Sequence, residues 1–234
     1  MSDVYRNQCM YQKSGNALNR AKEHIDEYAR LIIKKKVSDN RGTEEYRMLI
    51  ADYTNSKGAF RLAKGDFDGA EFYYDEAYVM RKNCVGSSHY KIASSLSHLG
   101  RVALLKNDYT KASRLIGESL AMRESIFHGS HPAIGASLYL KARLLHELGT
   151  FKECGLLMGK SLQVRKVSLG QKHPSVAQSL WGLAELYREL GYPLHARDYH
   201  DNALVIRKEK FSEVDVQTHA TWHRDIVVSL KVRD

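Results

Sequence analysis

Apolar residues recur every three or four positions along most of the chain, which is the spacing of amphipathic α-helices. The segment 175–190 is the clearest case, because its apolar residues fall at positions 176, 177, 180, 183, 184, 187 and 190. Pro174 precedes this segment and Gly191 follows it, so the pattern predicts a helix with both ends marked. A second helix is expected over 194–210, and another over 2–37.

This two-helix pattern repeats at a spacing of 42 residues. Three units open on a histidine, at His89, His131 and His173. Small residues recur where the two helices of a pair would touch, in the sets Gly58, Gly100, Ala142, Ala184; Ala70, Ala112, Cys154, Ala196; and Ala77, Ser119, Ser161, Ala203. A fixed period of this length is typical of stacked helical hairpins. The expected fold class is therefore all-α, a right-handed superhelical solenoid of helical hairpins.

The period also divides the chain into segments. Four complete units are expected at residues 45–86, 87–128, 129–170 and 171–212. Residues 1–44 are expected to form an N-terminal helical cap or partial repeat, and residues 213–234 a C-terminal capping helix. An arginine recurs at the period, as Arg81, Arg123, Arg165 and Arg207, and a turn is expected at Gly65, Asn107, Gly149 and Gly191.

The order of motifs in the last complete unit resembles the tetratricopeptide repeats of kinesin light chains and nephrocystin-like scaffolds. In those repeats His-Pro opens a unit, and Leu-Ala-x-Leu-Tyr, Gly-Tyr, Ala and Ala-Leu-x-Ile-Arg follow. The matching residues here are His173-Pro174, Leu183-Ala184-Glu185-Leu186-Tyr187, Gly191-Tyr192, Ala196 and Ala203-Leu204-Val205-Ile206-Arg207. The resemblance covers residues 45–234. It implies a protein-binding scaffold with cytoskeletal or motor-associated cargo.

The chain is basic, with 36 Lys and Arg against 27 Asp and Glu. The excess falls in the middle, where residues 129–170 carry six basic and two acidic residues. This favours an acidic partner, whether a peptide, a tubulin-like surface or a nucleic acid. No apolar run reaches the roughly 18–20 residues that cross a bilayer. The three isolated cysteines fit a reducing compartment, so a cytoplasmic location is expected, and the resemblance implies association with the cytoskeleton or a cilium.

Motifs of catalysis are missing from the sequence. It has no nucleophile elbow and no phosphate-binding loop, and Cys154 stands where other units carry a small core residue, so we expect neither an enzyme nor a cofactor. His219 and His223 have the i, i+4 spacing that can bind zinc, but no third ligand accompanies them, so no metal site is expected. The periodic histidines are expected at turns or helix caps.

A concave groove lined by the first helix of each unit is the expected binding surface. The positions that do not pack on the partner helix are Ser97, Arg101, Leu104, Tyr139, Arg143, His146, Trp181, Glu185 and Arg188. Aromatic rings beside guanidinium groups suit an extended peptide with an aromatic anchor and acidic neighbours. This surface is similar to the one with which kinesin light chains hold tryptophan-acidic cargo motifs. Ordinary solvated positions would explain the same residues equally well.

The predicted function is a non-enzymatic protein–protein interaction scaffold or adaptor that presents a basic groove to an acidic, aromatic-containing peptide segment. The alternative is a dedicated structural subunit of a large assembly such as an axoneme, because such a subunit needs no versatile groove. A third reading, a basic nucleic-acid-binding solenoid, ranks last. It would require aromatic stacking partners interleaved with the basic residues on one face, and the sequence shows no such stripe.

Overall fold

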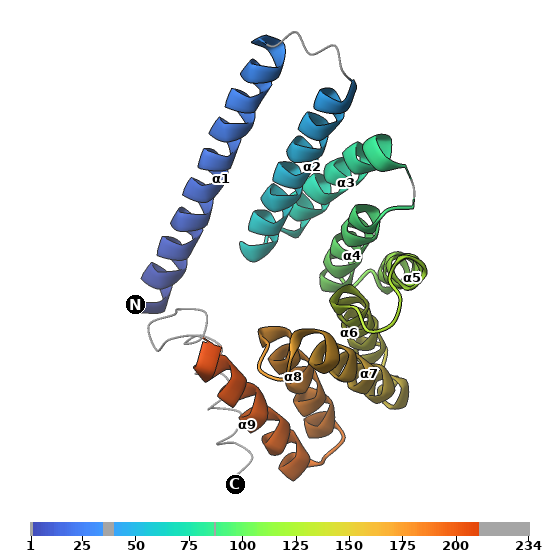
Figure 1. The fold of residues 1–234 in the computed structure, drawn as a ribbon. Coiled ribbons are helices and arrows are strands. Elements are labelled where there is room, and N and C mark those ends of the chain that lie inside the picture. Colours follow the sequence, from blue (N-terminus) through green and yellow to red (C-terminus); the bar gives the residue numbers. More distant parts are fainter. Residues whose placement is uncertain (1, 35–39, 87, 211–234) are drawn as a thin grey trace. The chain divides into compact units, whose positions relative to one another are not determined.

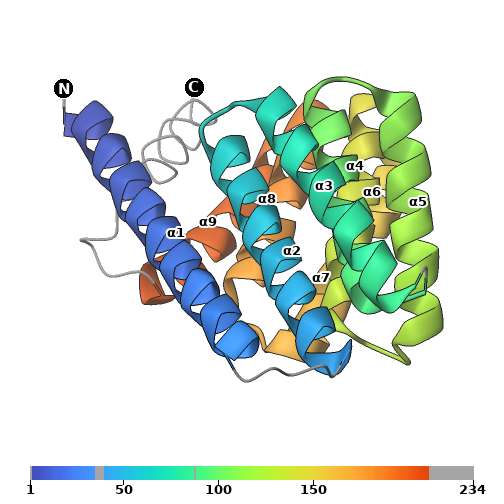
Figure 2. The same cartoon turned by 90° about the horizontal axis from the view of Figure 1, so that it is seen from above.

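The computed structural model describes residues 2–34, 40–86 and 88–210, and every regular element in these ranges is an α-helix (Figures 1 and 2). The helices are α1 (Ser2–Lys34), α2 (Asn40–Ala63), α3 (Phe67–Val85), α4 (Tyr90–Leu105), α5 (Tyr109–Ile126), α6 (Pro132–Glu147), α7 (Phe151–Leu169), α8 (Pro174–Glu189) and α9 (Pro193–Lys210). The three helices that the apolar pattern predicted appear as α8, α9 and α1. Within the described ranges, none of the helices has the length and apolar character needed to span a membrane.

The chain divides into two compact units, Met1–Met122 and Arg123–Asp234. In the first unit α1 packs on α2, α2 on α3, and α3 on α4. In the second unit α6 packs on α7, α7 on α8, and α8 on α9. Consecutive helices are therefore neighbours in space within each unit, as expected for helical hairpins.

The four turns inside the helix pairs share one backbone conformation. Gly65, Asn107, Gly149 and Gly191 have φ angles of 78°, 62°, 73° and 78°. Glycine adopts this left-handed region without strain, and asparagine tolerates it better than most residues do. Asn107 is the one non-glycine residue with positive φ in the described part of the chain. These turns confirm the predicted ones.

The periodic histidines cap the first helix of each pair. The Nδ1 atom of each ring accepts a hydrogen bond from the backbone N–H two residues further on. The pairs are His89 and Lys91 (3.2 Å), His131 and Ala133 (3.1 Å), and His173 and Ser175 (3.1 Å). Each ring thus satisfies a backbone donor that the helix itself leaves unpaired. The expected cap role is confirmed.

The small residues of the first helices lie against large side chains of the second helices. A Cβ atom added to Gly58 would lie 2.8 Å from the Tyr74 ring, and one added to Gly100 would lie 2.8 Å from Ile116 Cγ1. Such distances are too short for carbon atoms, so only a small residue allows the two helices to pack this closely. The residues at the Tyr74 position, one per hairpin, are Tyr74, Ile116, Met158 and His200.

In the first unit, a buried arginine ties the second helix of one pair to the first helix of the next. Arg81 Nη1 on α3 donates to Ser95 Oγ on α4 (2.7 Å), and its Nη2 donates to Asp52 Oδ1 on α2 (2.8 Å). Both Arg81 and Ser95 are buried. One side chain therefore bonds to two first helices at once.

The same contact recurs in the second unit. Arg123 Nη1 donates to the Ala133 carbonyl (3.0 Å) and to Ser137 Oγ (2.6 Å). Arg165 Nη1 on α7 donates to the Ser175 carbonyl (2.7 Å) and to Ser179 Oγ (2.8 Å) on α8. Burial lowers the pKa of each arginine to about 10, so both guanidinium groups keep their charge at neutral pH.

Two sequence expectations fall outside the described residues. These are the C-terminal capping helix over 213–234 and the pair His219 and His223. The unit boundaries at 45, 87, 129 and 171, and the cap or partial repeat over 1–44, stay predictions.

The close crossing of α4 and α5 in the first unit predicts opposite effects for two glycine substitutions. We expect Gly100→Ala to lower the free energy of unfolding by about 1–3 kcal/mol, because the added methyl group overlaps Ile116. Gly117→Ala on α5 meets no atom within 4 Å and should stabilise by about 0.5–1 kcal/mol through helix propensity. Urea denaturation followed by circular dichroism measures both, and a Gly100→Ala variant as stable as wild type would contradict the packing described here.

Candidate peptide-binding surface

In the first unit, the predicted groove residues Ser97, Arg101 and Leu104 all lie on α4. Ser97 and Leu104 are buried, whereas Arg101 is exposed. Arg101 makes no ion pair within the described part of the chain. Of these three residues, Arg101 is therefore the one whose side chain is exposed to solvent.

In the second unit, the predicted residues lie on two helices that contact each other, α6 and α8. Tyr139, Arg143 and His146 come from α6, and Trp181, Glu185 and Arg188 come from α8. Tyr139 is buried, Arg188 is exposed, and the other four are half-buried. The structure thus brings these six residues together on two contacting helices, α6 and α8.

Three of the nine predicted positions need correction, because Ser97, Leu104 and Tyr139 are buried and form no accessible surface. Leu104 is an apolar side chain inside the core. Tyr139 is covered because α8 carries glycine opposite it: a Cβ atom at Gly182 would lie 3.2 Å from the Tyr139 ring. The ring fills the space that a side chain at position 182 would otherwise occupy.

Most charges of the predicted surface are paired within the second unit. Arg188 Nη2 lies 2.9 Å from Glu185 Oε2 and 3.8 Å from Glu189 Oε1. His146 Nε2 lies 2.9 Å from Glu189 Oε2, close enough for an ion pair when the ring is protonated, although without the geometry of a hydrogen bond. Arg143 has neither a hydrogen bond nor an ion pair with any described residue. Arg143 is therefore the cation of this surface that remains available to a ligand.

Guanidinium groups do lie over aromatic rings in this unit, but they belong to residues outside the predicted set. Arg165 lies 4.8 Å from the centre of the Tyr139 ring, and Arg207 lies 5.1 Å from the centre of the Trp181 ring. Both arginines come from second helices. Their recurrence at the 42-residue period was the signal that could have pointed to them.

His200 occupies a core position that carries an apolar or aromatic side chain in the other hairpins. It is 1% exposed, its ring lies 4.4 Å from the Trp181 ring, and neither ring nitrogen has a hydrogen-bond partner among the described residues. Glu185 Oε1 lies 3.7 Å from Nε2. Burial lowers the pKa of His200; Glu185 and Asp201 oppose this shift, and Arg188 and Arg207 reinforce it. The imidazole is therefore neutral at neutral pH.

The described residues offer little for catalysis or metal binding. No group of three or more His, Cys, Asp or Glu side chains among them is placed to hold a metal ion. Cys154 is buried, and burial raises the pKa of its thiol to about 11, which keeps the sulfur protonated and unreactive.

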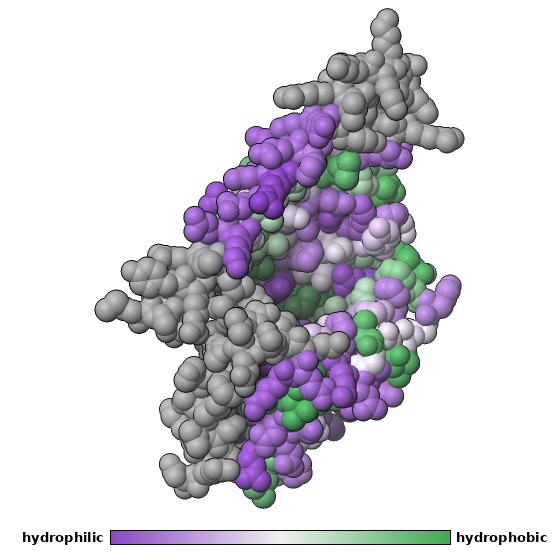
Figure 3. Space-filling model, turned by 60° about the vertical axis from the view of Figure 1, so that its left-hand side comes forward, coloured by the Kyte–Doolittle hydropathy of each residue, from purple (hydrophilic) through white to green (hydrophobic). Residues whose placement is uncertain are grey.

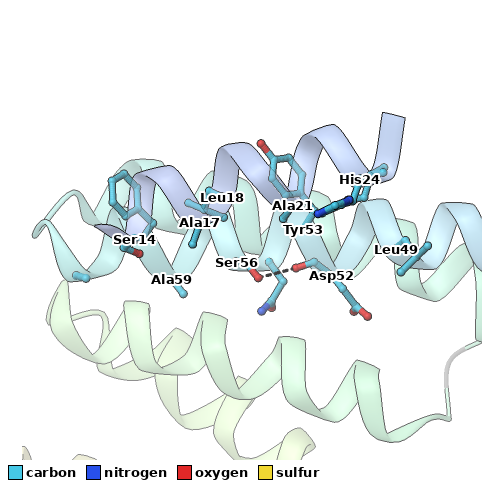
Figure 4. Close-up of a pocket in the computed structure, with 14 residues that line it drawn as sticks. Ser14, Ala17, Leu18, Ala21, His24, Leu49, Asp52, Tyr53, Ser56 and Ala59 are labelled. Carbon is cyan, nitrogen blue, oxygen red and sulfur yellow. Dashed lines mark hydrogen bonds between the residues drawn. The ribbon is translucent and has the colours of Figure 1, made fainter. Parts of the chain in front are cut away.

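A pocket that the sequence did not indicate lies between α1 and α2 in the first unit (Figure 4). Its volume is about 730 Å³, and apolar side chains such as Leu18, Ile25, Tyr53 and Phe60 line most of it. Ser56 Oγ, on its α2 wall, donates to the Asp52 carbonyl (2.9 Å), so this hydroxyl is occupied by its own helix.

Residues 49–125 match the tetratricopeptide repeat family. No curated protein matches the sequence. Among solved structures, BtubC (BKLC) from P. vanneervenii is 17% identical, with a TM-score of 0.67, over 94% of this chain and 82% of that one. PlcR of Bacillus thuringiensis, in complex with the peptide PapR7 and DNA, is 16% identical, with a TM-score of 0.61, over 97% of this chain and 76% of that one.

The repeats of a kinesin light chain-type protein from Podosopora anserina are 17% identical, with a TM-score of 0.53, over 88% of this chain and 96% of that one. The chain is therefore an all-α solenoid of helical hairpins. Residues 49–125 are similar to tetratricopeptide repeats, and the fold is similar to that of kinesin light chain-type repeats, as the motif order predicted.

The buried imidazole predicts a pH-dependent stability. The folded-state pKa of His200 lies below its ordinary value of about 6.5, so the unfolded chain binds the proton more readily. The contribution of the neutral His200 ring to stability is fully present above the ordinary pKa of about 6.5, and it is lost as the pH falls through the folded-state pKa. We expect wild type to lose more stability than His200→Met between pH 7.5 and 5.5, measured by urea denaturation.

Methionine is the matched replacement because Met158 fills the equivalent position. His128→Gln, at an exposed histidine, is the control and should follow the wild-type profile. Identical pH profiles for wild type and His200→Met would show that His200 is not the group responsible.

Proposed function

We propose that the chain is a non-enzymatic scaffold or adaptor that binds an acidic, aromatic-containing peptide segment on the first helices of its repeats. The observation that carries this proposal is Arg143 on α6, which has no ion pair in the described structure and shares its unit with the half-buried ring of Trp181. Arg101 on α4, at the equivalent position one period earlier, is exposed and also has no ion pair in the described structure.

The chemistry of these groups favours a carboxylate-bearing partner. A guanidinium group binds a carboxylate through two parallel hydrogen bonds, and a half-buried tryptophan offers a flat apolar contact for an aromatic or aliphatic anchor. Because the helices are already formed, the repeat side pays little ordering entropy when an extended peptide binds. Several contacts of this kind give moderate affinity.

Similar folds support a peptide as the ligand. PlcR is a structure with a bound peptide, and the Podosopora anserina repeats are those of a kinesin light chain-type protein. A cytoplasmic adaptor that holds cytoskeletal or motor-associated cargo is the form of the proposal that fits both the basic surface and these relatives.

A structural subunit of a larger assembly is the alternative, and the second helices favour it. Four large apolar side chains on α3, α7 and α9 are 62–65% exposed, namely Phe72, Leu156, Val167 and Leu194. Figure 3 shows small hydrophobic patches among hydrophilic residues on the visible face. Leu156 and Val167 are eleven residues apart, about three helical turns, so they lie on one side of α7 and would suit a fixed protein contact.

Charge reversal of the two open arginines tests the proposal. We expect Arg101→Glu/Arg143→Glu to lose the partners that wild type captures from lysate, identified by mass spectrometry, while its circular dichroism spectrum stays unchanged. The matched control is Lys141→Glu/Lys152→Glu, which changes the net charge equally at two other exposed residues and should keep the partners.

Equal capture by wild type and the arginine variant would overturn the basic-surface proposal. The alternative then has its own test, Leu156→Asp/Val167→Asp, which changes the exposed side of α7. Loss of partners from this variant alone would identify the chain as a subunit held through its second helices.

A further inference from the structure

The equivalent buried arginines Arg81 and Arg165 have different surroundings in the two units. In the first unit, Arg81 donates to the side chains of Ser95, Asp52 and Asn55, and Lys91 binds the same Asp52 carboxylate. Asp52 Oδ1 accepts from Arg81 Nη2 (2.8 Å), Asn55 Oδ1 accepts from Nη1 (3.3 Å), and Lys91 Nζ donates to the other carboxylate oxygen of Asp52 (2.8 Å). The carboxylate is thus held between two cations and compensates the buried charge.

In the second unit, two periods later, this carboxylate is missing. Ala136, Tyr139 and Ser175 occupy the positions of Asp52, Asn55 and Lys91. Arg165 keeps the bonds to the next helix through Nη1, and the Tyr139 ring lies beside its guanidinium group. Arg165 forms no ion pair with any residue in the described ranges. The register position that carries a carboxylate in the hairpin of Arg81 therefore carries an alanine in the hairpin of Arg165.

An uncompensated guanidinium group in this place is costly for the fold. Arg165 is 3% exposed, and a charge that loses its hydration shell needs either an opposite charge or a full set of hydrogen bonds. In the first unit, burial opposes ionisation of Asp52, but the hydrogen bonds from Lys91 and Arg81 hold its pKa below the usual value. Arg165 has no such partner, and burial alone dominates the lowering of its pKa.

In the first unit, the place of this carboxylate is open to solvent. The Asp52 side chain remains 43% exposed and borders a pocket of about 280 Å³ formed with Glu45, Met48, Leu49 and Lys91. In Figure 4 its carboxylate points away from α1. Ala136, at the same register position on α6, is half-buried, so a carboxylate could approach Arg165 from outside.

We propose that the edge of Arg165 beside Ala136 is a recognition site for a carboxylate of the bound acidic peptide. Asp52 shows within this same chain how the carboxylate would sit. Arg143, one turn beyond Tyr139 on α6, supplies a second cation for the neighbouring acidic residue of the peptide. This inference rests on the proposed function and names one subsite of it.

Grafting the missing carboxylate into the second unit tests the site. Ala136→Asp places on Arg165 the partner that Asp52 provides to Arg81, and Ala136→Asn adds the same volume without charge. The probe is a peptide of one tryptophan followed by four glutamates, compared with its glutamine analogue. We expect Ala136→Asp to weaken its binding by about tenfold or more in calorimetry, and Ala136→Asn to weaken it by about twofold or less.

A second variant creates an equivalent carboxylate site at Arg81 in the first unit. Asp52→Ala removes the internal carboxylate and opens the edge of Arg81, so we expect a second binding event for the glutamate peptide. This measurement does not require that Ala136→Asp folds. Nitrogen-15 spectra of the arginine side chains identify Arg165 as the group whose signal moves on titration of wild type.

The outcomes separate this inference from the proposed function. If Ala136→Asp binds the peptide as tightly as wild type, or if Ala136→Asn weakens it equally, the carboxylate subsite is wrong. The proposed function survives in that case provided that Arg143→Glu still weakens binding. If neither wild type nor Asp52→Ala binds the glutamate peptide in preference to its glutamine analogue, both the subsite and the acidic-peptide proposal fail.

Discussion

The hydrogen bonds of the periodic arginines connect each helix pair to the next, and the rest of the structure depends on them. A guanidinium group can donate to a backbone carbonyl and a serine hydroxyl at the same time, so one side chain sets both the height and the rotation of the following helix. Arg81, Arg123 and Arg165 each do this with a buried serine fourteen residues further on. The guanidinium charge is buried, so its hydrogen bonds favour the native register of the two helices. A shift of one helix along the other would leave the guanidinium group without its hydrogen-bond partners.

The remaining features that repeat make the hairpins themselves. A left-handed turn residue, a histidine cap and a small residue at the helix crossing recur in most units. They allow the tight turn, satisfy a backbone donor at the helix start and let the two helices pack closely. The units differ where single residues depart from the repeat. Asp52 neutralises Arg81 internally, Ala136 leaves Arg165 without a carboxylate, and His200 places an ionisable ring where other hairpins have an apolar side chain. These exceptions give each unit its own charge and burial pattern on an otherwise uniform scaffold.

Helices, turns and caps could be predicted from sequence because their determinants are local. The Pro174 and Gly191 signals lie next to the helix they delimit, and Asn107 carries the same turn signal as the glycines. The accessible surface could not be predicted in the same way. Tyr139 is buried because Gly182, on another helix, leaves room for its ring. Arg188 pairs with Glu185 on its own helix, which leaves Arg143 as the available cation of that surface. Such outcomes depend on which side chains meet across helices, and a helical offset alone does not contain that information.

A double-mutant cycle measures whether the arginine–serine contact couples neighbouring hairpins. The cycle would combine Arg123→Met with Ser137→Ala, whose side chains lie 2.6 Å apart, and compare the free energies of unfolding by urea. We expect a coupling energy on the order of 1–3 kcal/mol, as for other buried hydrogen bonds to a charged group. Effects that add to within about 0.5 kcal/mol would contradict it, because they would mean that the two side chains stabilise the fold independently.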